Sequence, residues 1–475
     1  MKNIKKTLNQ SVYKKINTLC ILAGELGEVE NIKVYIVGGV VRDLILGREV
    51  QDIDLMVEGD GIFFAKKLAS KIGVKKIVPF KKFGTAFIPN KSIQIEVASS
   101  RAEQYDLKSR SPSKIVFTNI EEDLRRRDFK INAMAVDINP KQYGDLYDPF
   151  NGINDLNKKI LCTPLDPDKT FSDDPLRMMR AAYFASKLNF KIDNNCRESI
   201  KQNADRIKIV SWERIRDEFI KILNTPKPSI GLVILQKTGL MKTVFPEIHV
   251  MYNMDQSPEW HHKDIFAHTL QVVDNAAELT NKMEIRFAAL VHDIAKPPTK
   301  RFDKKKGWTF HGHEEIGRRM LVKVARRMKL SNELRDYLMV LTKLHLRPIA
   351  LAKKEISDSA VRRVMFEAGD FIDDLMILCR ADITTKNPHK IKKYMNNFER
   401  VDMLMKNVKM KDEMKAFQSP VKGNEIMKTF SLSEGKIVGK IKKAIEDAIL
   451  DEKIPNTYDD AHAYMMEIKN QFIKD

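Results

Sequence analysis

The chain has 475 residues, of which 43% are hydrophobic and 31% charged, and its 83 Lys and Arg against 64 Asp and Glu give a net charge of +19. This length predicts two to four domains of ordinary globular composition, and the absence of any run of 18 apolar residues argues against a membrane span. The four scattered cysteines argue against zinc or disulfide frameworks and favour a reduced, cytoplasmic setting. The basic N-terminus precedes an apolar piece too short for a secretion signal, and the positive charge favours a polyanionic partner.

The first predicted element is an amphipathic helix over residues 1–30, where Val12, Ile16, Leu19 and Ala23 recur at helical spacing. The apolar residues 34–37 then predict a buried strand that ends at a glycine doublet, Gly38-Gly39. Glycines let backbone N–H groups approach an anion closely, and the positive end of a helix starting near Val41 would add to this. A lone Gly-Gly is more often a simple turn.

A second strand is predicted over residues 52–57, and it carries two acids. Because side chains alternate along a strand, Asp52 and Asp54 leave on one face, about 7 Å apart at a rise of roughly 3.3 Å per residue. Such a pair suits a hard divalent ion such as Mg²⁺, although a lone Asp-x-Asp is usually a solvated strand end. Together with the glycines, it predicts a phosphate site beside a metal site.

The next elements add a third acid. A helix is predicted over residues 62–72, then strands over 85–88 and 93–98 joined by a turn. Glu96 lies on the face opposite Ile95 and Val97, and we expect an inward-facing carboxylate that needs a partner because burying it alone is costly. An edge-strand acid facing solvent is the alternative.

A polar, Ser-rich and basic loop is predicted between Arg101 and Ile120, since its segment 105–113 is too polar to pack. Adjacent arginines follow at Arg126 and Arg127, before the next strand. Arginine forks bind phosphate oxygens in a bidentate way, so this pair suits a triphosphate, whereas a bare charge run is usually a solvated face.

These motifs resemble those of a known family. The order of strand, Gly-Gly, Arg42-Asp43, Gly47 and Asp-x-Asp closely resembles the nucleotidyltransferase signature of the DNA polymerase β superfamily, in particular class II tRNA nucleotidyltransferases (CCA-adding enzymes) and bacterial poly(A) polymerases. Residues 126–133 resemble the family's RRDFTINA motif and depart from it only at Lys130, and residues 96–101 resemble its third-carboxylate strand. The polar loop at 105–113 is needed in such enzymes for the terminal A, which argues against a CC-only enzyme.

The resemblance implies a role for each motif residue. The implied catalytic residues are Asp52, Asp54 and Glu96, with Asp52 and Asp54 holding Mg²⁺. The implied nucleotide-binding residues of the head are Gly38, Gly39, Arg42, Asp43, Arg126, Arg127, Asp128 and Asn132.

A helix is predicted to begin at Ser172-Asp-Asp-Pro, whose residues suit an N-terminus. Asp174 and Arg177 are three apart, so we expect them to share a helix face, or the acids serve only as caps. The segment resembles the family motif Glu/Asp-Asp-x-x-Arg, which implies that Asp174 and Arg177 read the incoming base with help from Arg180. A carboxylate accepts from the amino group of C or A while a guanidinium donates to the adjacent ring nitrogen, and G and U present the opposite order.

Nine of the ten histidines fall between His249 and His389. A His, then an adjacent His-Asp, then a distant Asp resembles the HD-domain pattern, with the implied ligands His268, His292, Asp293 and Asp382. His313 and His345 would complete a second metal position. Such ligands suit a divalent transition metal that activates water for phosphoester hydrolysis. The resemblance implies phosphohydrolase activity on phosphate esters or 2′,3′-cyclic phosphates, with a vestigial domain as the alternative.

The sequence thus predicts an α+β fold with a polymerase-β-like head and an all-α remainder. The predicted parts are an N-terminal helix (1–30), the head (31–137), a helical neck and body (138–250), an HD domain (251–390) and a helical basic tail (391–475). Residues 386–445 hold 15 Lys or Arg against 6 acids, which predicts a tRNA-facing surface or a solvated face.

The function implied by the resemblance is template-independent addition of C, C and A to the 3′ end of tRNA from CTP and ATP, without a membrane partner. Poly(A) or A-only addition is the nearest alternative, because such enzymes share these motifs. An HD phosphohydrolase with an RNA-binding head is another, although the intact Asp-x-Asp speaks against it, and a second-messenger hydrolase is a remoter third. The sequence leaves the oligomeric state open.

Overall fold

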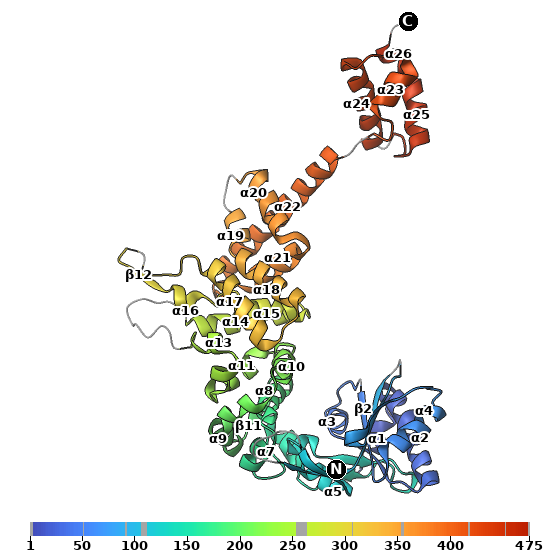
Figure 1. Cartoon of the computed structure of the whole chain (residues 1–475), viewed down its shortest axis with the longest axis vertical. Helices are drawn as coiled ribbons and strands as arrows, with labels where there is room; N and C mark the ends of the chain where they lie inside the picture. The colour runs from blue at the N-terminus through green and yellow to red at the C-terminus, as the bar shows by residue number, and fades with distance from the viewer. Residues whose placement is uncertain are drawn as a thin grey trace. The chain divides into compact units, whose positions relative to one another are not determined.

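The computed structural model describes residues 3–50, 52–90, 93–105, 112–252, 264–305, 307–352, 356–416, 419–451 and 453–473 (Figure 1). They divide into two compact units, one within residues 1–346 and 370–386 and the other within residues 347–369 and 387–475. No helix in these described ranges combines the length and the apolar character that a membrane crossing needs.

A mixed seven-stranded sheet forms the head, in the order β3-β4-β5-β2-β1-β8-β9. Its strands are β1 (Val34–Val37), β2 (Asp52–Val57), β3 (Val78–Phe80), β4 (Thr85–Ile88), β5 (Gln94–Ser99), β8 (Ala135–Asp137) and β9 (Leu146–Tyr147). β2 runs parallel to β5 and antiparallel to β1. β9 pairs with β8, so the sheet continues past residue 137, where the sequence analysis placed the end of the head.

Helices α2 (Lys14–Glu30) and α4 (Gly61–Lys71) pack against this sheet (Figure 1). The alternation in β2 is as predicted, because Ile53 and Leu55 are buried while Asp52 is exposed. The strands predicted at 85–88 and 93–98 are confirmed to within a residue.

The single helix predicted over residues 1–30 is wrong. The segment contains α1 (Lys5–Leu8), a 3-10 turn (Ser11–Tyr13) and then α2. Val12 lies in the turn and is 69% exposed, whereas Tyr13 is buried in its place. The helical spacing from Ile16 onward was correct, but the turn shifts the preceding residues off the buried face.

The loop predicted between Arg101 and Ile120 is also partly wrong. It contains the antiparallel strands β6 (Arg101–Tyr105) and β7 (Pro112–Phe117). One further backbone hydrogen bond, from the Thr118 N–H to the Ser100 carbonyl, joins the residues just outside this pair of strands. Residues 106–111 of the polar segment lie outside the described residues. Backbone pairing between strands needs no apolar side chains, so the polar composition did not reveal it.

The head also contains the short helix α5 (Ile120–Arg125), and the neck that follows is helical. The helices of the neck are α6 (Gly152–Lys158), α7 (Pro167–Asp173), α8 (Leu176–Leu188), α9 (Asn194–Asn203), α10 (Trp212–Leu223), α11 (Pro228–Lys237), α12 (Leu240–Val244) and α13 (Pro246–His249). α8 packs against α10 and α11. Phe219 of α10 contacts the rings of Phe245 and Phe287 at 5.7 and 6.1 Å, which joins the neck core to the next helical domain.

That domain is built from α14 (Ile265–Leu279), α15 (Met283–Val291), α16 (Lys296–Thr299), α17 (His313–Met328), α18 (Asn332–Leu344) and α21 (Ile372–Ala381). Buried Arg286 of α15 donates to the carbonyls of Leu223, Thr225 and Thr280, so its charge is solvated by backbone dipoles. A two-stranded hairpin, β12 (Arg301–Asp303) and β13 (Gly307–Thr309), projects from it (Figure 1).

The second unit contains α19 (Arg347–Leu351), α20 (Asp358–Ala368) and the long α22 (Pro388–Ala416), and then α23 (Gly423–Phe430), α24 (Lys436–Leu450), α25 (Tyr458–Glu467) and α26 (Lys469–Phe472). The last four helices share an apolar core that includes Ile426, Ile441 and Met465.

Candidate active site

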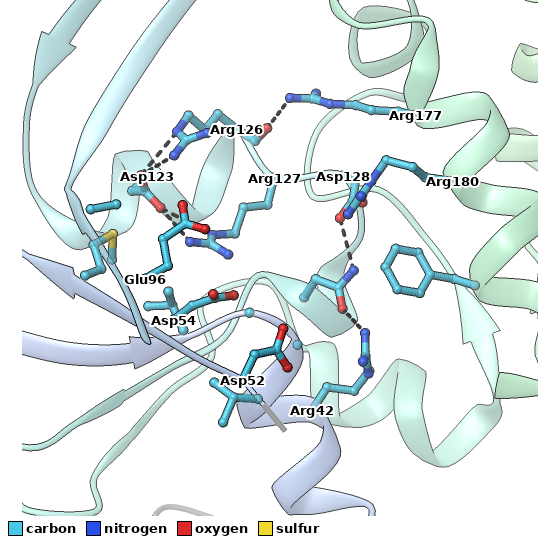
Figure 2. A pocket seen from close by; sticks show the side chains of 18 of the residues that line it. Arg42, Asp52, Asp54, Glu96, Asp123, Arg126, Arg127, Asp128, Arg177 and Arg180 are labelled. Atoms are coloured by element: carbon cyan, nitrogen blue, oxygen red, sulfur yellow. Dashed lines mark hydrogen bonds and ion pairs between the residues drawn. The ribbon is translucent and has the colours of Figure 1, made fainter. Parts of the chain in front are cut away.

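Three carboxylates gather on one face of the head sheet. Asp52 and Asp54 leave the same side of β2, and the parallel register places Glu96 of β5 directly beside Asp54 (Figure 2). The expectation that Glu96 is buried is wrong: its side chain is exposed, because it opens into the pocket described below. The pairing of β2 with β5 otherwise places the three acids as predicted, on one face of the sheet.

The Asp54 carboxylate lies in surroundings that disfavour its charge. Burial raises its pKa to about 6, Arg127 opposes the shift, and Glu96 and Asp52 add to it. Neighbouring carboxylates repel one another unless a cation lies between them. All-oxygen donors of this kind are those that Mg²⁺ prefers, so Asp52, Asp54 and Glu96 fit a magnesium site.

Gly38 connects β1 to α3 (Gly39–Ile45) with φ +75°. A Cβ at Gly38 would lie 2.7 Å from Nη1 of Arg127 and 3.7 Å from a carboxylate oxygen of Asp54. The glycine therefore leaves the space in which the Arg127 guanidinium meets the carboxylates.

Both predicted phosphate-binding arginines are held by one acid, Asp123 of α5. Arg126 donates to Oδ1 at 2.6 Å and Arg127 to Oδ2 at 3.1 Å, and the Asp123 side chain is buried (Figure 2). Burial opposes ionisation, but the two guanidinium groups hold the pKa of Asp123 below its ordinary value. Arg126 also donates to the backbone carbonyl of Arg101. The arrangement fixes two guanidinium groups beside the carboxylates.

A chain of hydrogen bonds runs from the head to the neck. Arg42 donates to Asn132 at 2.6 Å, Asn132 donates to Asp128 at 3.1 Å, and Arg180 of α8 donates to the other Asp128 oxygen at 2.6 Å (Figure 2). Both arginines also contact the Phe184 ring, whose centroid lies 5.3 Å from Cζ of Arg42 and 5.2 Å from Cζ of Arg180.

This chain of hydrogen bonds also holds Arg42, for which triphosphate binding is predicted. Its side chain is 2% exposed and is paired with Asp43 at 2.7 Å as well as with Asn132. These contacts favour a supporting role over direct triphosphate binding.

The base-reading pair is placed differently from the expectation. Asp174 and Arg177 do not share a helix face, because α7 ends at Asp173 and α8 begins at Leu176, with Asp174 extended between them. Asp174 accepts from the Leu176 N–H as a cap, and Arg177 donates to the backbone carbonyl of Arg126 at 2.5 Å. Both residues still line the same pocket as the carboxylates.

That pocket has a volume of about 520 Å³, within the range of nucleotide-sized sites. Every residue predicted for the catalytic and nucleotide-binding site lines it: Gly38, Gly39, Arg42, Asp43, Asp52, Asp54, Glu96, Arg126, Arg127, Asp128, Asn132, Asp174, Arg177 and Arg180. The sequence analysis missed Asp123, Lys187, Arg214 and Lys221, which also line it. Asp123 stands three and four residues before the two arginines, about one helical turn, and this spacing could have revealed it.

A second constellation lies in the helical domain. His268, His292 and Asp382 bring ligand atoms within 4.8 Å of one another, and so do Asp293, His313 and His345. These residues come from or directly follow four helices, α14, α15, α18 and α21, and the start of α17. The predicted HD ligands therefore converge, together with both residues predicted for a second metal position. Two further histidines of the histidine-rich stretch, His261 and His262, lie outside the described residues.

The ring orientations at this second constellation suit metal ions. His292, His313 and His345 each donate Nδ1–H to the carbonyl three residues earlier, at 2.7–2.8 Å. When the rings are neutral, the Nε2 lone pairs face one another and the carboxylates. Burial opposes protonation of His292, but Asp293 and Asp382 raise its pKa to about 9, so a metal ion bound at its Nε2 would displace a proton. Burial and the neighbouring His292 lower the pKa of His345 to about 4, so its ring is neutral.

Close contacts among the ligand atoms support the same conclusion. Within the described part of the chain, His292 Nε2 and Asp382 Oδ1 are buried and make no hydrogen bond of good geometry, although His292 Nε2 lies 3.1 Å from Asp293 Oδ2 and Asp382 Oδ1 lies 3.0 Å from His268 Nε2. Buried polar atoms with poor hydrogen bonds are costly, and divalent ions would satisfy these imidazole and carboxylate donors.

Three family descriptions match successive parts of the chain: Poly A polymerase head domain at residues 34–162, probable RNA- and SrmB-binding site of polymerase A at 189–252, and HD domain at 265–387. A Multifunctional CCA protein of Vibrio parahaemolyticus is 32% identical over 365 residues, which cover 74% of this chain and 85% of that protein. The chain belongs to the family of CCA-adding tRNA nucleotidyltransferases.

Solved structures agree with this membership. An apo CCA-adding enzyme covers 98% of this chain and 99% of its own, with a TM-score of 0.61 at 23% identity, and supports the fold alone. A tRNA nucleotidyltransferase solved with a primer tRNA and an incoming ATP analogue covers 80% of this chain and 99% of its own, at 26% identity and a TM-score of 0.57. The predicted fold class, a nucleotidyltransferase head followed by helical neck, HD domain and tail, is confirmed.

In this CCA-adding family member, residues of the head and neck line one candidate site, and residues of the HD domain form a second candidate site. The roles of the individual residues in both remain predictions.

Proposed function

We propose that this enzyme adds C, C and A to the 3′ end of tRNA, using CTP and ATP, in the cytoplasm. The observation that carries the proposal is the single pocket that unites three carboxylates, two anchored arginines and the Asp174–Arg177 pair in a member of the CCA-adding family. The test supplies tRNA ending before CCA, or ending in CC, with CTP, ATP or both. Addition of A alone, or of long A tails, would instead indicate an A-adding enzyme or a poly(A) polymerase.

In the proposed reaction, the RNA 3′-oxygen attacks the α-phosphorus of the nucleotide, and pyrophosphate leaves as the bond between the α- and β-phosphates breaks. Asp52, Asp54 and Glu96 would hold Mg²⁺, which would favour loss of the hydroxyl proton and offset the charge on the phosphates. Arg126 and Arg127 would bind triphosphate oxygens, since Asp123 orients both guanidinium groups.

Base choice would depend on residues at the junction of α7 and α8. Asp174 would accept from the amino group of cytosine or adenine, and Arg177 would donate to the adjacent ring nitrogen. The contact of Arg177 with the Arg126 carbonyl links this reading position to the phosphate-binding arginines. Guanine and uracil would leave both groups unmatched.

A second activity, metal-dependent phosphohydrolysis in the HD domain, is proposed from the converging Nε2 atoms of His292, His313 and His345. Divalent transition-metal ions held there would polarise water and the phosphate oxygens. The test measures hydrolysis of p-nitrophenyl phosphate and a 2′,3′-cyclic nucleotide by the metal-loaded and chelator-treated enzyme. Equal rates before and after chelation, or none with any divalent metal, would contradict it.

A further inference from the structure

The β12–β13 hairpin is inserted between two candidate metal ligands of the HD domain, because it lies between Asp293 and His313 in the chain. Phe302 and Trp308 are directly opposite each other in its register and therefore project from the same face. Their ring centroids are 5.2 Å apart, at an interplanar angle of 72°. The hairpin thus presents an aromatic pair on one of its faces.

Two lysines lie near aromatic rings of this segment, and one of them also contacts a candidate metal ligand. Lys300 Nζ lies 4.2 Å from the Trp308 ring centroid, and Lys296 Nζ lies 5.8 Å from that of Phe310. Lys296 also contacts Asp293 Oδ2 at 2.5 Å. We call these five residues, Phe302, Trp308, Lys300, Phe310 and Lys296, the aromatic–lysine track.

The track is poorly explained by packing. Phe302 is 52% exposed, so its ring contributes little buried apolar area to a hairpin whose strands have three residues each. The neighbouring Arg301, Lys304 and Lys305 are exposed, and Asp303 is the acid among residues 300–305. Exposed rings within a basic segment are the surface that single-stranded nucleic acid binds, with bases stacked on rings and phosphates near cations.

We propose that the aromatic–lysine track binds the last nucleotides of an RNA strand and delivers its terminal phosphate to the HD site. This inference rests on the proposed phosphohydrolase function and adds to it a binding surface for an RNA strand beside the HD site, which a small phosphate ester would not use. Hydrolysis breaks the bond between phosphorus and the terminal ribose oxygen, water supplies the oxygen of the released phosphate, and the ribose oxygen gains a proton. The product has the free 3′-hydroxyl that nucleotide addition by the head requires.

The test compares two substrates of the metal-loaded full chain: a single-stranded RNA oligonucleotide with a 3′-phosphate, and p-nitrophenyl phosphate. Loss of one stacked base is expected to raise KM for the oligonucleotide relative to KM for the small ester by about 5- to 100-fold in Phe302→Ala. Phe366→Ala, which removes an 89% exposed ring on α20, is the matched control and should leave the ratio unchanged. An unchanged ratio in Phe302→Ala would overturn the proposal.

A second measurement needs no hydrolysis and separates this proposal from the phosphohydrolase function. The chain has three tryptophans, so the Trp308 contribution to fluorescence is the difference between the native chain and Trp308→Phe. The oligonucleotide should quench that contribution in the metal-free protein, and less so after Phe302→Ala. Quenching without hydrolysis would support RNA binding by the aromatic–lysine track and refute the phosphohydrolase function. The absence of quenching would refute RNA binding by the track.

Discussion

Arg127 occupies the space that a side chain at Gly38 would need, since a Cβ there would lie 2.7 Å from its Nη1. The contact joins the glycine doublet to the arginine motif, two segments far apart in sequence. The geometry of the proposed triphosphate site should therefore be sensitive to a single methyl group at Gly38.

Gly38→Ala is therefore expected to reduce nucleotide incorporation by more than tenfold, because Arg127 must move and the backbone conformation at φ +75° is strained for alanine by about 1–3 kcal/mol. Incorporation of labelled CMP into tRNA lacking CCA measures the loss. Gly47→Ala is the matched control: Gly47 also has a positive φ, +65°, but a Cβ there meets no atom within 4 Å. Equal losses in both variants would show that strain, not displacement of Arg127, is responsible.

Asp123→Asn is expected to raise KM for CTP and ATP, because a neutral amide no longer holds Arg126 and Arg127. Breaking a buried ion pair typically costs about 3 kcal/mol, so a lower free energy of unfolding should accompany the kinetic effect. Urea denaturation and steady-state kinetics give the two quantities. Glu121→Gln, which alters an exposed ion pair with Arg125 in the same helix, should change neither by much. An unaltered KM in Asp123→Asn would contradict the anchoring role.

Asp52→Ala should abolish incorporation while the protein remains folded, because the exposed Asp52 carboxylate is a proposed Mg²⁺ ligand rather than a core residue. Circular dichroism and the incorporation assay decide between loss of function and loss of fold. Normal incorporation by this variant would refute the metal assignment.

The raised pKa of Asp54, about 6, predicts a pH-dependent demand for Mg²⁺. Below that pH the folded protein holds a proton that the metal must displace, so half-saturating Mg²⁺ should rise about tenfold per pH unit as the pH falls from 6 to 5. In the metal-free protein, the effect of Asp54 on stability is opposite to that of a salt-bridged acid. Its pKa in the folded protein exceeds the ordinary 3.8, so ionisation of Asp54 lowers the free energy of unfolding as the pH rises from 3.8 to about 6.

Glu96→Gln tests the cause of that shift. Removing the Glu96 charge should move the pH at which the Mg²⁺ requirement rises to a lower value, since Glu96 contributes to the raised pKa of Asp54. Half-saturating Mg²⁺ measured between pH 5 and 8 for both proteins provides the comparison, and coincident profiles would exclude the coupling.

The sequence predicted those features of the site that follow from local alternation and spacing. Asp52 and Asp54 share a face because a strand has a period of two residues. Asp174 was misplaced, although a local signal existed: it precedes Pro175, and proline disfavours helical conformation in the residue before it, which separates α7 from α8. The pairing of Arg42 with Asn132, 90 residues away, depends on tertiary packing and has no local signal.

The two ligand triads of the HD domain predict two bound divalent ions per chain. His345→Ala should remove one of them, because His345 belongs to the triad with Asp293 and His313, while His268→Ala should affect the other triad first. Metal content after dialysis, measured by mass spectrometry of the elements, tests this directly, and calorimetric titration gives the affinity of each ion. Incorporation by the head is the internal control for folding. If His345→Ala retains the same metal content as the native chain, Asp293, His313 and His345 do not form a separate ion site, and the convergence of their Nε2 and carboxylate atoms serves the first ion alone.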